Sequence, residues 1–256
     1  MAQTWLEFAD YCKPFCFLLL IKTQNPYRES KVLSKIKKNI NELGILIAFL
    51  YFIDQLLKKL NKKSGLYFYY FYDQKFESKP VREPRKKVFD FYWIDKVDDM
   101  IVDLPRPRSV LNSRFQSGSR CMVAKKVDAN EFLGCAWFSY GFYQEDEVNC
   151  LYEFTNSQKV WDYDIYVKPE LRMSRLFLRL WQQASKSLYE DGYTSSLSRI
   201  SAYNLQSIRS HEKLGATKVG WSLFFKVSHF QLMFSSKAPY LSLSYKNHGQ
   251  PRLTFT

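Results

Sequence analysis

The stretch from Trp161 to Gly215 constrains the fold of this chain more than any other. Residues 161–167 alternate apolar and polar side chains, which is the pattern of a half-buried strand. Residues 169–191 then follow a helical period, and Pro169 suits the first turn of a helix because that turn leaves its N–H groups unpaired. A second strand and a second helix complete the stretch. The order strand, helix, strand, helix predicts an α/β (α+β) fold in which helices cover a sheet.

Two motifs within this stretch resemble the GCN5-related N-acetyltransferase (GNAT) superfamily, whose core reads V-x-P-x-x-R-G-x-G-x-G-x-x-L and, after a strand, N-x-x-A-I-x-x-Y-E-K-L-G-F. The first motif is matched by Val167, Pro169, Arg172 and Leu180. The second is matched by Asn204, Ser207, Ile208, His211, Glu212, Lys213, Leu214, Gly215 and Ala216. The resemblance implies a GNAT-like mixed, mostly antiparallel central sheet flanked by helices, with its core motifs at residues 161–216.

The acyl-donor loop departs from the family pattern. Met173, Arg175 and Phe177 stand where the family has glycines, which let the N–H groups of a helix N-terminus approach the pyrophosphate of coenzyme A. Arg172 and Arg175 either replace those contacts with charge-assisted phosphate bonds or face solvent. The donor-binding positions that the resemblance implies are Val167, Arg172, Met173, Ser174, Arg175, Leu176, Phe177, Asn204 and Ser207.

The resemblance also implies the catalytic positions. His211 stands where many family members have a Tyr that protonates the leaving thiolate, and imidazole can do this because its pKa lies near 6.5. Asp162 and Asp164 are the nearest carboxylates for a base. Because they are two residues apart, the strand pattern predicts that both carboxylates lie on one side of the strand. There they either act as a base or form a structural pair with Arg172 or Arg199.

The resemblance implies two further features of the site. Asn204 either bonds the pantetheine of the donor or caps the helix that follows it. The family's splayed strand, which ends here at Val167, would offer a backbone N–H to the thioester carbonyl, a role that needs no particular side chain.

The charge of the chain points to an anionic partner. With 38 Lys and Arg against 25 Asp and Glu, the net charge is +13, which suits a phosphorylated cofactor, an acidic carrier protein, an anionic lipid or nucleic acid. No helix-turn-helix signal, zinc spacing or RNP-like stretch supports nucleic acid. Five cysteines without CxxC spacing and three histidines indicate neither a metal site nor a disulfide framework. We therefore expect a cytoplasmic protein without a bound metal.

Residues 1–64 are expected to form a helical, apolar and basic N-terminal extension to a GNAT-like domain at residues 65–256. Phe15–Ile21 is apolar but too short to span a bilayer, and a heptad-like pattern runs on from Glu29. The apolar run Leu43–Ile53, which Gly44 can interrupt, either packs on the core or lies in a membrane interface. In the second case Lys58, Lys59, Lys62 and Lys63 lie at headgroup level, and the protein is peripheral on the inner face of the membrane.

The rest of the chain predicts mostly strands. Gly65–Tyr72 is aromatic without alternation, which indicates a strand covered on both faces. Residues 73–87 are polar and predict a long loop. Further strands are predicted at Lys87–Ile94, Cys121–Val127, Gly134–Tyr140, Val219–Val227 and Phe230–Ser235, with a short helix at Ser109–Gln116. The alternating tail after Pro239 predicts an edge strand.

The expected function is therefore GNAT-like N-acyl transfer from a thioester to an amine that the sequence does not identify. The donor is acyl-CoA or the acyl-phosphopantetheine of an acyl carrier protein. An acidic carrier protein suits the basic chain. Its phosphopantetheine also lacks the pyrophosphate that the family's glycines contact. The alternative is a catalytically inactive GNAT-like module that docks a partner protein or a membrane surface.

Overall fold

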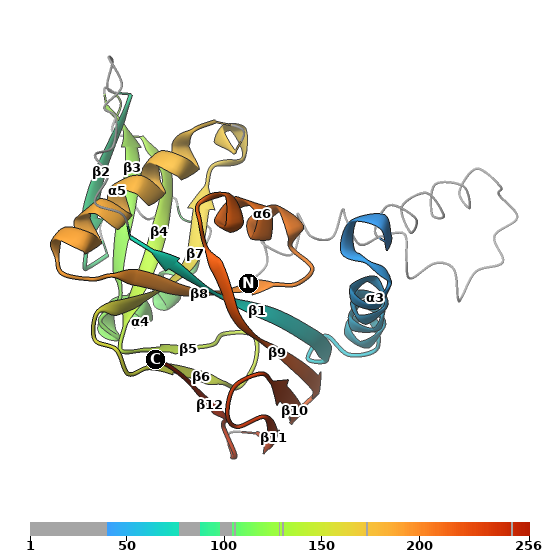
Figure 1. Cartoon of the computed structure of the whole chain (residues 1–256). Helices are drawn as coiled ribbons and strands as arrows, with labels where there is room; N and C mark the ends of the chain where they lie inside the picture. The colour runs from blue at the N-terminus through green and yellow to red at the C-terminus, as the bar shows by residue number, and fades with distance from the viewer. Residues whose placement is uncertain are drawn as a thin grey trace, which may run out of the picture.

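A nine-stranded sheet forms the centre of the computed structural model (Figure 1). The structure describes residues 40–76, 88–97, 104, 106–127, 129, 131–172, 174–246 and 248–256. Its strands are β1 (Gly65–Lys75), β2 (Phe89–Ile94), β3 (Arg120–Lys126), β4 (Phe132–Tyr140), β5 (Phe142–Gln144), β6 (Leu151–Phe154), β7 (Lys159–Val167), β8 (Ser195–Ser201), β9 (Thr217–Val227), β10 (Phe230–Ser235), β11 (Leu241–Tyr245) and β12 (Arg252–Phe255). Its helices are α3 (Ile45–Leu60), α4 (Arg108–Gln116), the 3₁₀ turn η3 (Pro169–Leu171), α5 (Leu176–Glu190) and α6 (Leu205–Lys213).

The strand order of the large sheet is β11-β10-β9-β1-β8-β7-β4-β3-β2. Within it, β7 and β8 form a parallel pair, and the other neighbouring strands are antiparallel. A second sheet, of order β12-β6-β5, pairs β12 parallel to β6. The predicted mixed, mostly antiparallel sheet is confirmed, as are the helix at Ser109–Gln116 and the edge strand after Pro239, which is β11.

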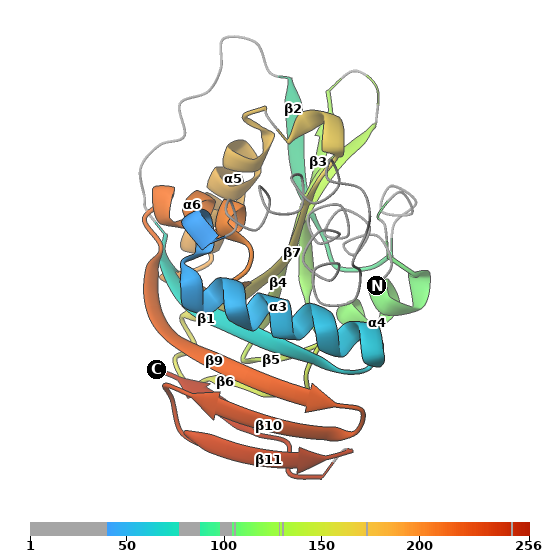
Figure 2. The ribbon, with the colours of Figure 1, turned by 90° about the vertical axis from the view of Figure 1, so that its right-hand side faces the viewer.

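Two layers cover the large sheet. Helix α5 buries Leu180, Ala184 and Leu188 against one face, where α6 and α3 also lie (Figures 1 and 2). On the opposite face the three-stranded sheet packs through Tyr152 and Phe255, and α4 packs farther along. The layering follows from the alternation of the strands, because successive side chains of one strand enter different cores.

Strand β1 is aromatic because both of its faces are covered. Tyr69 and Phe71 enter the core beneath the three-stranded sheet, whereas Tyr72 packs with Ile200 and Ile208 on the helix side. The predicted burial on both faces is confirmed. The chain order does not reveal its position, however, since this N-terminal strand lies between β8 and β9.

Helix α3 uses only one side for packing. Gly44, with φ of +78°, separates it from the helical turn at residues 40–43, as the sequence allows. Tyr51 is buried and its ring contacts Tyr203, whereas Ile45 and Phe49 are exposed. One side of the apolar run thus packs on the domain, and the other remains uncovered by described residues. No helix in the described segments is long and apolar enough to cross a bilayer.

Several sequence predictions lie outside the described residues. They are the apolar segment Phe15–Ile21, the heptad-like pattern up to residue 39, and residues 77–87 of the predicted loop, whose first residues instead continue β1 to Lys75.

Asp54 fixes α3 to the start of β1. The carboxylate is 1% exposed, accepts the Leu66 N–H at 2.9 Å and pairs with Lys58 at 2.7 Å. Burial raises its pKa, although Lys58 and the Leu66 N–H oppose the shift.

We expect Asp54→Ala to lower the free energy of unfolding by about 2–4 kcal/mol, because it leaves a buried N–H unpaired and removes the ion pair with Lys58. Denaturant titration measures the loss, and faster hydrogen exchange at the Leu66 amide locates it. Lys59→Ala, an exposed change on the same helix, is the control and should cost less than about 0.5 kcal/mol. Equal effects of the two variants would contradict this role of Asp54.

Candidate active site between strands β7 and β8

The parallel pairing of β7 and β8 ends after three residue pairs, from Lys159↔Ser195 to Trp161↔Leu197. Beyond that point β7 remains paired with β4, and β8 remains paired with β1. The facing edges of the two strands therefore part without either strand losing its outer neighbour. Backbone groups on such an unpaired edge can bond a ligand. The splayed strand that the family resemblance implies is present.

A bulge in β7 lies directly after this point. The register between β4 and β7 shifts between Cys135 and Trp137, and Asp164 adopts a φ of +48°. A bulge inserts an extra residue, so the side chains beyond it change face. Asp162 consequently points to the helix side and Asp164 to the opposite side, as their partners below show. The prediction that both carboxylates share one side is wrong, because period-2 alternation does not hold across a bulge.

Asp162, Ser196 and His211 meet on the helix side. Ser196 donates its hydroxyl hydrogen to Asp162 Oδ2 at 2.5 Å, and both residues are buried. His211 Nε2 lies 3.9 Å from Asp162 Oδ1, an ion-pair distance. His211 Nδ1 lies 2.8 Å from the carbonyl oxygen of Ser207, one helical turn earlier in α6. Residues from two strands and one helix therefore converge where β7 and β8 separate.

These partners favour the charged imidazolium form of His211. The Ser207 carbonyl can only accept, so Nδ1 must carry a hydrogen. A neutral ring would then direct the lone pair of Nε2 at the Asp162 carboxylate, whereas a protonated ring directs an N–H at it. Burial lowers the pKa of His211, but the contact with Asp162, its negative charge and the Ser207 carbonyl outweigh burial and raise the pKa above the ordinary 6.5.

Aromatic rings from α5 surround this histidine. The ring of Phe177 lies 6.2 Å from that of His211, and the ring of Trp181 lies 6.1 Å away. His211 is 5% exposed. Phe177, which replaces a family glycine, thus lies beside the predicted catalytic residue and limits the access of water to it.

Asn204 caps α6 in the structure. Its side-chain oxygen accepts the backbone N–H of Ser207 at 3.1 Å. Of the two roles open for Asn204, this is the one that the contacts show. The cap also orients Ser207, whose carbonyl holds the His211 ring, so both motif residues help to position the histidine.

The donor loop folds without glycine. Ser174 donates its hydroxyl hydrogen to the Leu171 carbonyl at 2.6 Å and accepts the Leu176 N–H at 3.1 Å, which shapes the entry to α5. No described residue between Lys168 and Leu176 has a positive φ. Val167 and Leu176 are buried, whereas Arg172 and Arg175 are exposed. Met173 lies outside the described residues.

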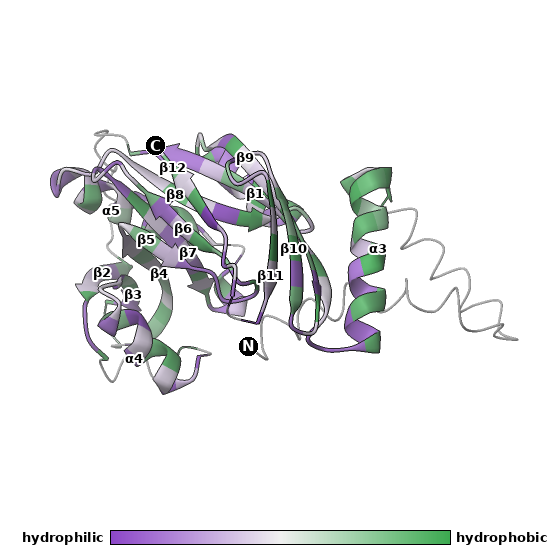
Figure 3. Ribbon diagram, turned by 90° about the horizontal axis from the view of Figure 1, so that it is seen from below, coloured by the Kyte–Doolittle hydropathy of each residue, from purple (hydrophilic) through white to green (hydrophobic). Residues whose placement is uncertain are grey.

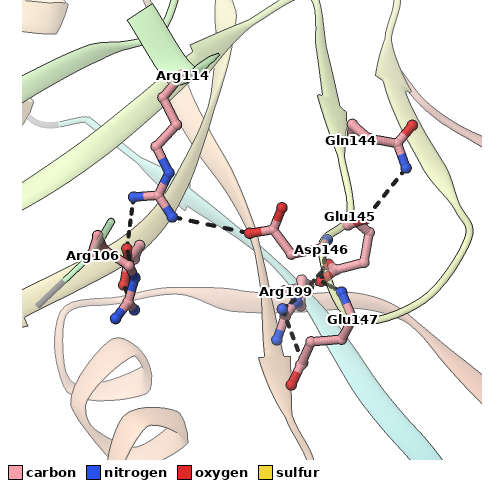
Figure 4. Close-up of polar contacts among 8 residues, drawn as sticks. Arg106, Arg114, Gln144, Glu145, Asp146, Glu147 and Arg199 are labelled. Atoms are coloured by element: carbon pink, nitrogen blue, oxygen red, sulfur yellow. Dashed lines mark hydrogen bonds and ion pairs between the residues drawn. The ribbon is translucent and has the colours of Figure 1, made fainter. Parts of the chain in front are cut away.

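The face opposite α5 and α6 carries a network of charges that the sequence did not predict (Figure 4). Asp164 pairs with Arg106 and with Arg114, the latter at 2.7 Å. Arg114 also lies 4.0 Å from Asp146, in the segment that joins β5 to β6. Asp164 is therefore engaged by two guanidinium groups, on the side of β7 that faces away from His211.

Arg199 of β8 occupies the centre of the second half of this network. It donates two hydrogen bonds of 2.6 Å to Glu145 and lies 3.1 Å from Glu147. Tyr69 donates its hydroxyl hydrogen to Glu147 at 2.7 Å. Burial raises the pKa of Glu145 despite Arg199, whereas Arg199 and Tyr69 outweigh burial at Glu147 and lower its pKa. Arg199 therefore pairs with Glu145 and Glu147, and neither predicted aspartate needs it.

Only a weak sequence signal marked these residues. The acidic run Glu145–Glu147 reads as a polar turn, and Arg199 as one polar position in an alternating strand. Their pairing depends on a contact across 54 residues, which no local pattern reports. Among the described residues no group of His, Cys, Asp and Glu could hold a metal ion.

No family model and no curated protein matches the chain. Among solved structures, a GCN5-related N-acetyltransferase from Sphaerobacter thermophilus is 12% identical with a TM-score of 0.43, over 66% of this chain and 54% of that chain. A tandem GNAT protein from the clavulanic acid biosynthesis pathway is 13% identical with a TM-score of 0.44, over 63% and 53%. AAC(6')-Iy, in complex with the bisubstrate analogue CoA-S-monomethyl-acetylneamine, is 16% identical with a TM-score of 0.37, over 50% and 90%.

This chain spans about half the length of the first two of these proteins. The likenesses are distant, and the topology of the chain itself identifies its fold. A mostly antiparallel sheet holds one parallel pair of strands that separates, and α5 and α6 follow those two strands directly. The fold is GNAT-like.

The pairing of His211 with Asp162 predicts a pH-dependent stability. Because the folded-state pKa of His211 lies above its unfolded value, the contribution is complete below about pH 6.5 and is lost as pH rises through the folded pKa. We expect the free energy of unfolding of the unmodified chain, relative to Asp162→Asn, to fall as pH rises above about 6.5. Denaturant titrations from below to well above this pH measure it.

Asp191→Asn is the control for that experiment, since Asp191 forms an exposed pair with Arg120 away from His211. Its difference from the unmodified chain should not vary with pH. If the difference in unfolding free energy between the unmodified chain and Asp162→Asn does not vary with pH, Asp162 does not raise the pKa of His211.

Proposed function

We propose that this protein is an N-acyltransferase that moves an acyl group from a phosphopantetheine thioester to an amine. The observation that carries the proposal is the separation of β7 from β8 beside the His211–Asp162–Ser196 cluster. Acyl transfer from a thioester needs three things: a polarised carbonyl, a base for the amine and a proton for the departing sulfur. The residues at this point of the fold can supply each of them.

The unpaired edge of β7 beyond Trp161 would polarise the thioester. A backbone N–H there can donate to the carbonyl oxygen as the amine attacks and the tetrahedral intermediate becomes an oxyanion. This contribution depends on the backbone, so side-chain identity in this part of β7 is free to vary. The departure of β8 is what ends strand pairing along this edge.

His211 would protonate the departing sulfur. When the tetrahedral intermediate collapses, the carbon–sulfur bond breaks and the thiolate takes the proton of the imidazolium. A raised pKa suits this role because it favours the charged ring, which is the form that can donate a proton. Asp162 stabilises the imidazolium, and it is the nearer carboxylate for the proton that the amine loses, directly or through water. Ser196 holds Asp162 in place.

The donor loop favours a phosphorylated donor. Helix α5 has no acidic residue in its first turn, and Arg172 and Arg175 are exposed beside that turn. The positive end of the helix and two guanidinium groups both attract phosphate. Acyl-CoA and the acyl-phosphopantetheine of a carrier protein share this chemistry, and assays with each donor distinguish them.

We expect His211→Phe to lower turnover by about ten- to thousandfold, because the sulfur then leaves without a proton donor. His211→Asn is a second variant that keeps a donor for the Ser207 carbonyl but removes Nε2, and its loss should be similar. The readout is release of free thiol from acyl-CoA and from acyl carrier thioesters. His229→Phe, outside this cluster, is the control. An unchanged rate in both His211 variants would remove the histidine from the mechanism.

We expect the double variant Arg172→Ala with Arg175→Ala to raise the apparent dissociation constant of the donor without lowering kcat. Each lost charge-assisted phosphate bond should cost about 1.5–3 kcal/mol. Titration with acyl-CoA and with an acyl carrier protein gives two values. A change with acyl-CoA alone assigns the arginines to the nucleotide phosphates, a change with both assigns them to the pantetheine phosphate, and a change with neither contradicts the donor site. Arg252→Ala is the exposed control.

The alternative function, a GNAT-like module without catalysis, is tested by the same donors. A thioester at a hundred times its dissociation constant should stabilise an active enzyme by about 2.7 kcal/mol. Neither thiol release nor stabilisation with any thioester would favour the inactive module.

A further inference from the structure

The outer face of β9, β10 and β11 is apolar across all three strands. Leu232 lies opposite Phe225 on one side and Leu243 on the other, and Phe230 lies between Val227 and Tyr245 in the same way. The members of this face are Trp221, Leu223, Phe225, Val227, Phe230, Leu232, Phe234, Leu241, Leu243 and Tyr245. We call it the C-terminal apolar face. Leu243 is 64% exposed and Leu241 is 60% exposed.

The inner side of the same strands is partly polar. Phe224 and Met233 enter the core there, but Gln231, Ser235 and Ser244 are also buried, and each bonds a backbone group: Gln231 with Asn149, Ser235 with Trp221 and Ser244 with Gly249. The apolar side chains of the outer side are not members of the buried core clusters, and an exposed apolar patch of this extent marks an interaction site.

The apolar surface continues onto α3. Figure 2 shows α3 crossing in front of β1, with β9, β10 and β11 uncovered by any described helix on that side. Figure 3 shows hydrophobic colouring on α3 and on the neighbouring strands. Phe68 of β1 contacts Trp221 and so joins the two parts. Ile45, Leu46 and Phe49 of α3 are exposed.

The charged side chains of the C-terminal segment that forms this surface are all cationic. The sequence contains no Asp or Glu after Glu212. Lys218 lies over the ring of Tyr70, next to the apolar face, and Lys246 lies by Tyr245 at its edge. Lys62 and Lys63 follow α3, and a hydrogen bond from Ser228 N to Ser64 Oγ holds that segment against the β9–β10 turn.

We propose that the C-terminal apolar face and the exposed side of α3 dock together on an anionic lipid surface. Apolar side chains enter the boundary of the acyl chains while the bordering lysines contact the headgroups. A second copy of this chain fits less well. Two such faces packed together would bring cationic borders into contact, with no acidic residue after Glu212 to pair with them. The inference is independent of acyl transfer.

The test is co-sedimentation of the full chain with vesicles of phosphatidylcholine alone or mixed with phosphatidylglycerol. We expect binding to the anionic vesicles that weakens, but persists, as salt is raised. Leu241→Gln with Leu243→Gln should reduce the partition coefficient by about tenfold or more, because each change removes exposed apolar area that enters the lipid. Lys62→Glu with Lys63→Glu should reduce binding to the anionic vesicles by about threefold or more.

Phe142→Gln is the matched control, since Phe142 is 45% exposed but lies on β5. It should bind as the unmodified chain does. Brominated lipids should quench tryptophan emission less in Trp221→Phe than in the unmodified chain, because Trp221 lies on the proposed lipid-binding face. Absence of vesicle binding by the full chain would overturn the proposal. Vesicle binding by the double leucine variant equal to that of the unmodified chain would also overturn it. A dimer of the unmodified chain in analytical ultracentrifugation that becomes a monomer in this variant, together with no vesicle binding, would instead assign the face to a second copy of the chain.

Discussion

The loss of hydrogen bonding between β7 and β8 beyond Trp161 and Leu197 is the constraint on which the rest of the site depends. Two parallel strands can part inside a sheet only if each is held from its other side. Here β4 holds β7 and β1 holds β8. The separation leaves backbone groups of both strands without hydrogen bonds to each other. Paired side chains lie on either face of this point: Asp162 with His211 on the side of α6, and Glu145 with Arg199 on the other.

Charge is distributed unevenly around this point. The chain carries a net charge of +13, and among the described residues the ionic groups inside the fold include the pairs Arg199–Glu145, Arg114–Asp164 and Lys58–Asp54. Exposed cations of the described residues lie on the donor loop and along the border of the C-terminal apolar face. A basic isoelectric point thus describes what the surface attracts and says little about the interior of the site.

The features that the sequence predicts well are those with local causes. The motif register places His211 and Asn204 correctly on α6, and the aromatic run predicts β1, because spacing and composition determine both. Asp164 escapes prediction since a bulge reverses its side, and a bulge arises from the pairing with β4. Glu145 and Arg199 escape it because their contact joins distant segments. The donor loop shows a third case, in which hydrogen bonds of the Ser174 side chain shape a turn that contains no glycine.

Strand β1 gives the sheet an unusual folding history. Its neighbours β8 and β9 are both made long after it, and 137 residues separate Leu66 from Tyr203, whose hydroxyl bonds its carbonyl. During synthesis at about 5–20 residues per second, the strand must wait on the order of ten seconds for its partners. Throughout that time eight residues rich in Tyr and Phe, Gly65–Tyr72, remain without a sheet. Such non-local topology slows folding, and an aromatic strand without its partners is an aggregation hazard until β9 emerges.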